Sequence, residues 1–190
     1  MLVIPLVVAI LAIATWTDFR WRKIFNWLTY PAILTAIGLN LLGSLAYVAG
    51  GFSGDFLNRL GLIGFSQSVL GFLTCGGILL ACYVFFPVGG GDVKLMAALG
   101  AFLGPERGIE VLLWSFILGG CAALIIIIWR IGILELLYRL TRSVWHLVRW
   151  RAWIPLSAED PAAWEPPLFL APCALIAVGI VESGMGTWLW

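Results

Sequence analysis

The sequence predicts an all-α fold, a polytopic integral membrane bundle of about six transmembrane helices. Of its 190 residues, 62% are hydrophobic and only 11% are charged. In soluble domains roughly a quarter of the residues are charged, so this chain has too few charges to cover a water-exposed surface. The net charge of +1 gives no reason to expect a nucleic-acid partner. We therefore expect the lipid bilayer to be its environment.

Six apolar segments are long enough, or nearly so, to cross the hydrocarbon core, which takes roughly 20 helical residues. They are residues 1–17, 27–49, 66–87, 93–104, 108–130 and 168–190. The first has neither a basic start nor a small-residue cleavage site, so we expect a retained span rather than a signal peptide. The fourth is short and ends at Pro105, which leaves a tilted or partial crossing open.

Basic residues gather on alternate loops between these segments. Nine of the eleven lie on one set of loops: Arg20, Arg22, Lys23, Lys94, Arg130, Arg139, Arg142, Arg149 and Arg151. Lys and Arg are enriched on the cytoplasmic side of a membrane. With six spans, both termini then face outward, and residues 18–26, 88–94 and 131–167 are cytoplasmic.

We expect one membrane-embedded domain over residues 1–190, with residues 131–167 forming a cytoplasmic insertion. The apolar residues of 131–150 recur at helical spacing and are accompanied by arginines. This pattern is typical of an amphipathic helix lying on anionic headgroups, although a plain extension of the fifth span fits equally well. Residues 151–167 are acidic and Pro-rich, which indicates a loop.

Two carboxylates, Asp18 and Asp92, are distinguished by their position. Asp18 follows the first span and Asp92 precedes the fourth, so the predicted topology puts both at the same membrane face. A charge at this depth costs free energy, which makes such residues functional candidates. When two carboxyl groups share a site, like-charge repulsion lets the pair retain one proton. Taken singly, either residue could instead cap a helix or pair with an arginine.

Asp92 follows three glycines in the stretch Val88-Gly89-Gly90-Gly91-Asp92-Val93-Lys94. Glycines can adopt φ > 0 and allow a second chain to approach closely, as an extended peptide substrate would require. A structural alternative is that Asp92 is the N-cap of the fourth helix. A phosphate-binding loop is not indicated, because no Gly-Lys-Ser/Thr follows.

These motifs resemble those of a known family. Residues 89–94 match the GxGDxK motif of the GxGD membrane aspartic proteases, and residues 18–26 resemble the D-x-R-x-x-x-I-P-N signature of the type IV prepilin peptidases. The chain also resembles that family in its six spans and in the prolines near the final segment, Pro167 and Pro172. Phe25 departs from the pattern, since the family usually has proline there. The chain also lacks the family's N-terminal CxxC-containing insertion, so it resembles a short, peptidase-only form.

The resemblance implies specific roles and partners. Asp18 and Asp92 would be the catalytic aspartates, and the supporting or substrate-binding residues would be Arg20, Asn26, Gly89, Gly91 and Lys94. The activity would be removal of the basic leader peptide from prepilins or pseudopilins in a bacterial or archaeal inner membrane, at the cytoplasmic face. No metal or other cofactor is expected, and the four cysteines form no CxxC pair.

Three other functions are alternatives to this one. Interfacial acids can serve a proton-coupled transporter, but the chain lacks paired halves with broken helices. A preflagellin-type or presenilin-like GxGD protease is a closer alternative, although presenilins place the first aspartate in a Tyr-Asp pair, whereas Thr17 precedes Asp18 here. A scaffold that has lost catalysis is disfavoured by the two intact aspartates. Glu182, in the last segment, is left unassigned.

Overall fold

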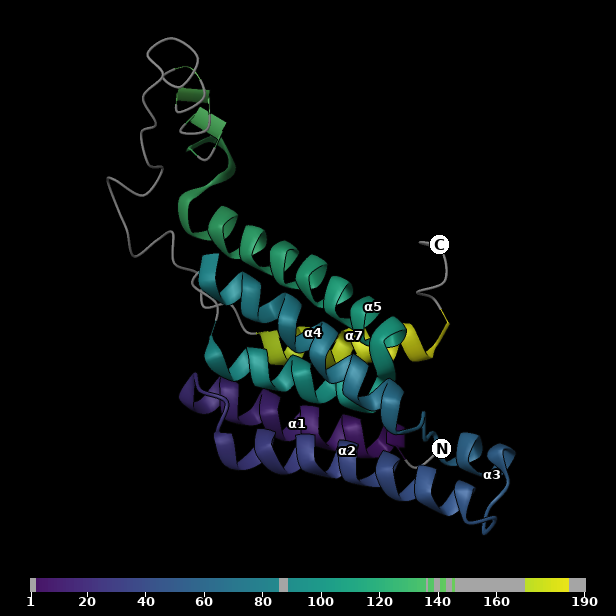
Figure 1. Ribbon diagram of the computed structural model, residues 1–190. Helices are drawn as coiled ribbons and strands as arrows, with labels where there is room; N and C mark the ends of the chain where they lie inside the picture. Colours follow the sequence, from purple (N-terminus) through teal and green to yellow (C-terminus); the bar gives the residue numbers. More distant parts are fainter. Residues whose placement is uncertain are drawn as a thin grey trace. The chain divides into compact units, whose positions relative to one another are not determined.

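The computed structural model describes residues 3–85, 89–135, 137–138, 141–142, 145 and 170–184 (Figure 1). Its elements are helices, and no strand occurs in these residues, which confirms the all-α prediction. The helices are α1 (Val3–Trp21), α2 (Asn26–Val48), α3 (Gly54–Leu60), α4 (Phe65–Phe85), α5 (Gly90–Ile131) and α7 (Leu170–Glu182).

The chain forms two compact units. One comprises Met1–Phe116 and Phe169–Trp190, and the other Ile117–Leu168. Within the second unit, α5 ends at Ile131, Gly132 has a φ of 88°, and residues 133–135 are again helical. Most of the insertion predicted over 131–167, including the acidic stretch 151–167, lies outside the described residues.

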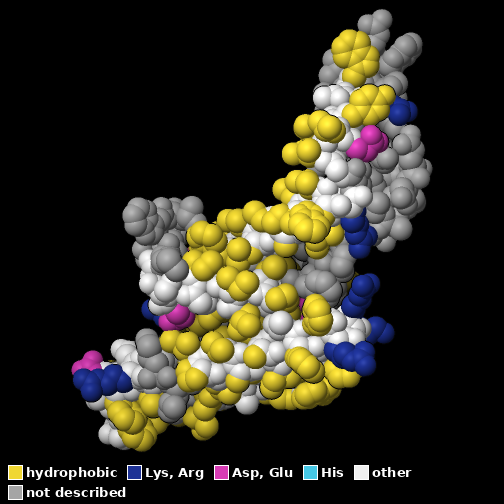
Figure 2. All heavy atoms as spheres, turned by 180° about the vertical axis from the view of Figure 1, so that it is seen from behind, with side chains coloured by type: hydrophobic (Ala, Val, Ile, Leu, Met, Phe, Trp, Pro, Cys, Tyr) yellow, Lys and Arg dark blue, Asp and Glu magenta, His cyan; other side chains and the backbone are white. Residues whose placement is uncertain are grey.

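Four of the helices are long and apolar enough to cross a membrane. For example, α1 has 19 residues and α2 has 23, which at 1.5 Å per residue gives lengths of about 30 Å, the thickness of the hydrocarbon core. On the face drawn in Figure 2, hydrophobic side chains cover most of the helical surface, and Lys and Arg gather at its margins. The chain is thus a multi-pass membrane protein.

Helix α5 contains both the fourth and the fifth predicted spans. Gly104 breaks it with φ 84° and ψ 175°, immediately before Pro105. A Cβ added to Gly108 would lie 3.1 Å from the Cα of Gly100. In a continuous helix these two residues would be about 12 Å apart, so the chain turns back on itself at Gly104. The predicted end of the fourth span at Pro105 is therefore confirmed.

The first half of α5 is the central helix of the unit. Every residue from Leu95 to Leu103 is buried, whereas an amphipathic helix would bury one face only. A helix that is apolar all round belongs in such a fully enclosed position. Its 14 residues from Gly90 to Leu103 therefore need not match the bilayer thickness, because neighbouring helices shield them from lipid.

Glycines allow α4 to pack directly against this central helix. A Cβ on Gly71 would clash with the backbone carbonyl of Gly100, and one on Gly76 would lie 3.0 Å from the Cβ of Ala97. Ser68 Oγ also donates to the carbonyl of Ala101 at 2.7 Å. Small residues at helix contacts permit this close approach in membrane proteins. The contacts fix the central helix, and hence Asp92 at its start.

Helix α1 packs against α7 through a narrow buried stripe. The stripe contains Val7, Leu11 and Ala14 and continues to Asp18, at spacings of three or four residues. Residues at this spacing share one helix face. The side chain of Asp18 therefore lies on the face of α1 that is turned toward the interior of the unit.

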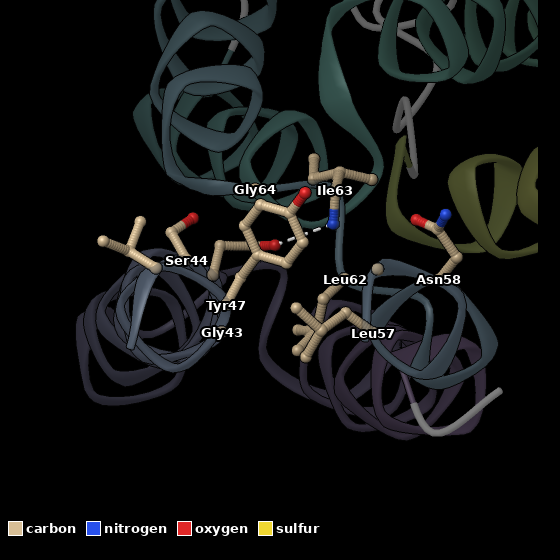
Figure 3. A pocket seen from close by; sticks show the side chains of 11 residues that line it. Gly43, Ser44, Tyr47, Leu57, Asn58, Leu62, Ile63 and Gly64 are labelled. Carbon is tan, nitrogen blue, oxygen red and sulfur yellow. Dashed lines mark hydrogen bonds between the residues drawn. The ribbon is translucent and has the colours of Figure 1, made fainter. Parts of the chain in front are cut away.

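A loop and a short helix cover the other end of the unit. Asn40 Oδ1 accepts the backbone N–H of Ile63 at 2.9 Å, and Ser44 Oγ accepts that of Phe65 at 2.9 Å. Asn40, Ser44 and Ile63 line a cavity of about 290 Å³ (Figure 3). The polar groups of Asn40 and Ser44 thus serve to hold the connection into α4.

Candidate functional site

A cavity of about 330 Å³ lies at the end of the unit where α1 ends and where α2 and α5 begin. Its lining comes from two stretches far apart in the sequence: Asp18, Arg22, Lys23, Ile24, Phe25 and Asn26 from the first, and Gly89, Gly90, Gly91 and Asp92 from the second. The predicted placement of Asp18 and Asp92 at one end of the bundle is therefore observed, and both side chains share a single cavity.

Asp18 lies in the last turn of α1, which extends to Trp21 and thus beyond the predicted first span. Its side chain is buried, with 8% of the residue surface exposed. The Oδ2 atom has no hydrogen-bond partner among the described residues. Helix α7, whose first turn contains the fully buried Ala171, packs against α1. An acceptor atom is thus left unused in a buried site.

Asp92 is the third residue of α5, which begins at Gly90. It is therefore not the N-cap that the sequence suggested as a structural alternative, because the helix starts two residues earlier. Its backbone N–H donates to the carbonyl of Gly89 at 3.0 Å. Its carboxylate lies close to that glycine, because a Cβ added to Gly89 would be 2.8 Å from Oδ2 of Asp92. Asp18 is close enough for its charge to act on Asp92.

The glycines before Asp92 matter for close approach rather than for unusual backbone angles. None of Gly89, Gly90 and Gly91 has a positive φ, so the expectation of φ > 0 is wrong at these positions. A Cβ on Gly91 would lie 2.9 Å from the Cβ of Ile24 and 3.2 Å from its carbonyl oxygen. The start of α5 therefore touches the backbone of the loop that follows α1.

That loop is shaped by Arg22. Its φ is 51°, the only positive value among the described non-glycine residues. Its N–H donates to the carbonyl of Asp18 at 2.8 Å, which ends α1 in the left-handed manner usually reserved for glycine. The chain then runs extended to Phe25, whose carbonyl accepts the N–H of Leu28 at 3.1 Å and starts α2.

A polar cluster beside the cavity joins α2 to α5. Lys94 Nζ donates to Asn26 Oδ1 at 2.8 Å and to the Tyr30 hydroxyl at 3.2 Å. The same ammonium lies 4.8 Å from the centre of the Tyr30 ring, within the range of a cation–π interaction. Because Lys94 follows Asp92 by two residues and Asn26 follows Phe25, this cluster ties together the two stretches that line the cavity.

The structure brings together all the predicted site residues except Arg20. Arg20 is exposed, does not line the cavity, and has its guanidinium 6.0 Å from the Trp21 ring. Sequence reasoning missed Tyr30. It could have been found, because it follows Asn26 by four residues and so shares its helix face.

Fold and site define a multi-pass membrane protein with a buried and a partly buried carboxylate in one cavity at one end of the bundle. A comparison with protein-family models matches residues 6–124, more than half of the chain, to the type IV leader peptidase family. The chain therefore belongs to this family, and it is a peptidase. A search of curated proteins and one of solved structures gave no match.

Proposed function

We propose that the chain is an aspartic endopeptidase in which Asp18 and Asp92 are the two catalytic residues. The observation that carries this proposal is that two carboxylates, from helix ends 74 positions apart, line one cavity in a chain of the leader peptidase family. A transporter is not favoured, because both acids lie at one end of the bundle rather than near its middle.

Two neighbouring carboxyl groups can hydrolyse a peptide bond when one is ionised and the other protonated. The ionised group takes a proton from a water molecule, whose oxygen attacks the carbonyl carbon. The protonated group donates to the carbonyl oxygen, which gives a neutral tetrahedral diol. The C–N bond then breaks as the protonated carboxyl gives its proton to the nitrogen and the ionised one takes a proton from a hydroxyl of the diol, so the pair again holds a single proton.

The neighbouring residues have supporting roles in this proposal. Lys94 and Asn26 hold the two lining stretches at a fixed separation through their 2.8 Å hydrogen bond. Gly89 and Gly91 leave room for the Asp92 carboxylate and for the loop at Ile24. Arg20 lies outside the cavity, so we assign it to the charge of the loop rather than to substrate contact.

The substrate we propose is a prepilin or pseudopilin, and the reaction removes its basic leader. Such a substrate keeps a charged leader in water and an apolar stem in the bilayer, so its cleavage point lies at the membrane surface. The cavity lies at helix ends flanked by exposed Trp21 and Trp27, residues that prefer membrane interfaces. We place this end at the cytoplasmic face of a bacterial or archaeal inner membrane.

A cleavage assay in membranes tests the proposal. The chain is co-expressed with a panel of prepilins, and the loss of the leader is followed by mobility shift and mass. Asp18→Asn and Asp92→Asn should each abolish cleavage while inserting normally. Asp55→Asn, in α3, is the matched control and should cut like wild type. A variant at Asp18 or Asp92 that still cuts would exclude that residue from catalysis.

A further inference from the structure

Tyr30 contacts the ammonium group of Lys94 in two ways at once. It lies on α2, one turn after Asn26, and its hydroxyl accepts an N–H of Lys94 at 3.2 Å. The centre of its ring lies 4.8 Å from the same nitrogen, a distance at which a cation is attracted to an aromatic face. Tyr30 belongs to neither of the two sequence motifs, 18–26 and 89–94, so it adds a contact that the motifs do not contain.

Lys94 needs such partners because of where it lies. It is in the second turn of α5 and directly precedes the buried residues 95–103. An ammonium group has three N–H donors and is strongly hydrated in water. Within the described residues no carboxylate forms an ion pair with Lys94, whereas Asn26 and Tyr30 each accept a hydrogen bond from it. Two neutral residues of α2 therefore hold this cation.

The ammonium group is directed toward α2 rather than toward the aspartates. Lys94 follows Asp92 by two residues, which corresponds to about 200° around a helix, so the two side chains leave α5 on nearly opposite sides. Asp92 lines the cavity and Lys94 does not. Lys94 therefore acts on the cavity through α2, whose first residue, Asn26, is part of the lining.

We propose that Tyr30 is a positioning residue of the peptidase. Its ring and hydroxyl hold the Lys94 ammonium against Asn26, and this bridge keeps the starts of α2 and α5 at the spacing that the catalytic cavity requires. The inference rests on the proposed function. Tyr30 does not line the cavity, so it acts on the reaction through Lys94 and not by contact with the substrate.

The test separates the ring from the hydroxyl. Tyr30→Phe removes the hydroxyl and keeps the ring, whereas Tyr30→Leu removes both. Each substitution is also made together with Lys94→Met, which removes the cation. The matched control is Tyr47→Leu, because Tyr47 lies on the same helix with a similar exposed fraction, 58% against 51% for Tyr30, and lines the cavity at the other end of the unit.

Single-turnover cleavage should slow about tenfold in Tyr30→Leu and about threefold in Tyr30→Phe, because the ring contact survives the loss of the hydroxyl. Tyr47→Leu should cut at the wild-type rate. In the Lys94→Met background, Tyr30→Leu should bring no further loss, because its partner is already absent. A wild-type rate in Tyr30→Leu would overturn the inference. So would an equal loss with and without the Lys94 ammonium, which is the result expected if Tyr30 only fills space.

The contact can also be followed without activity, by NMR of the protein with isotope-labelled lysine Cε. The chain has two lysines, Lys23 and Lys94, and Lys23→Arg assigns their signals. The Tyr30 ring shifts the Lys94 signal away from that of the exposed Lys23. Tyr30→Leu should therefore move it toward the Lys23 position, while Tyr30→Phe and Tyr47→Leu leave it close to its place.

Failure of the proposed function would be recognised separately, since the wild type would then cut no substrate. The Lys94 signal alone then decides the inference. Its displacement in Tyr30→Leu supports Tyr30 as the residue that positions Lys94, and an unmoved signal refutes it.

Discussion

Alanine substitutions at the three consecutive glycines before Asp92 should have three different outcomes. Gly90 and Gly91 are the first residues of α5, Gly89 immediately precedes them, and none of the three has a positive φ. Alanine brings no backbone strain at such positions, so only the space around the added methyl group distinguishes them. This makes the series an internally controlled test of the site geometry.

Gly90→Ala is the reference substitution. The nearest atom to its added Cβ is Cε2 of Tyr83 at 3.9 Å, an ordinary van der Waals distance. Alanine is favoured over glycine in a helix by about 0.5–1 kcal/mol. We therefore expect the stability to rise slightly or stay unchanged, and cleavage to match that of wild type.

Gly91→Ala has the same helical advantage but meets the loop after α1. Its Cβ would lie 2.9 Å from the Cβ of Ile24, whereas carbon atoms pack best at about 3.5 Å or more. Either the loop or the start of α5 must then move by roughly 0.6 Å. Overpacking of this kind costs about 1–3 kcal/mol, and displacement of about 1 Å can slow catalysis by about 100-fold. We expect cleavage to fall at least tenfold.

Gly89→Ala separates activity from stability. Its Cβ would lie 2.8 Å from Oδ2 of Asp92, the free end of a side chain that can rotate away. The fold should therefore lose little stability, while the carboxylate leaves its position in the cavity. The loss of cleavage should equal or exceed that of Gly91→Ala.

The measurements are single-turnover cleavage of a prepilin substrate and thermal unfolding, both in detergent. Equal activity in Gly90→Ala and Gly91→Ala would refute the inferred contact between Ile24 and the start of α5. Full activity in Gly89→Ala would show that the Asp92 carboxylate does not need its observed position. Unfolding of Gly90→Ala would contradict the open space at that residue.

Three further predictions concern the surroundings of the pair. Asn26→Ala and Lys94→Met should each slow cleavage. The double variant should be little slower than either alone, because both substitutions remove the same hydrogen bond; additive effects would contradict this. Arg22→Gly should raise the free energy of unfolding by up to about 1 kcal/mol relative to Arg22→Ala by relieving the positive φ, and no difference would refute the strain. Arg107→Gln should lower the free energy of unfolding more than Glu182→Gln does, by on the order of 1 kcal/mol, because it leaves the less exposed Glu182 carboxylate unpaired. Equal losses in the two variants would count against the 3.6 Å ion pair.

Much of the fold could be predicted because membrane helices are encoded by composition. Apolar runs and the prolines and glycines that end them are local features, so the break before Pro105 was visible in the sequence. The enclosure of residues 95–103 was not visible, because a helix buried in protein and one exposed to lipid have the same apolar composition. The short helix α3 was also missed, because Gly54–Leu60 lies outside the six apolar segments.

The candidate site was predictable only where its residues are close in sequence or share a motif. The topology placed Asp18 and Asp92 at one end because each follows or precedes a span. The contact of Asn26 with Lys94 was not predicted, since hydrogen-bond partners 68 positions apart depend on how α2 and α5 pack. Glu182 was left unassigned for the same reason: its partner Arg107 lies on another helix, across the fold-back of the chain.

The position of the two aspartates at helix ends reconciles two demands on hydrolysis in a membrane protein. Carboxyl groups that share a proton benefit from burial, whereas the reaction consumes water, which the hydrocarbon core excludes. Asp18, in the last turn of α1, is buried, and Asp92, in the first turn of α5, is partly buried. The cavity between them is nevertheless bordered by the exposed residues Arg22, Lys23 and Asn26. The packed helices therefore bury the carboxyl groups, while the loop after α1 leaves the cavity open to water. An aspartate moved one helical turn further into the bundle would still be buried but would no longer have access to water.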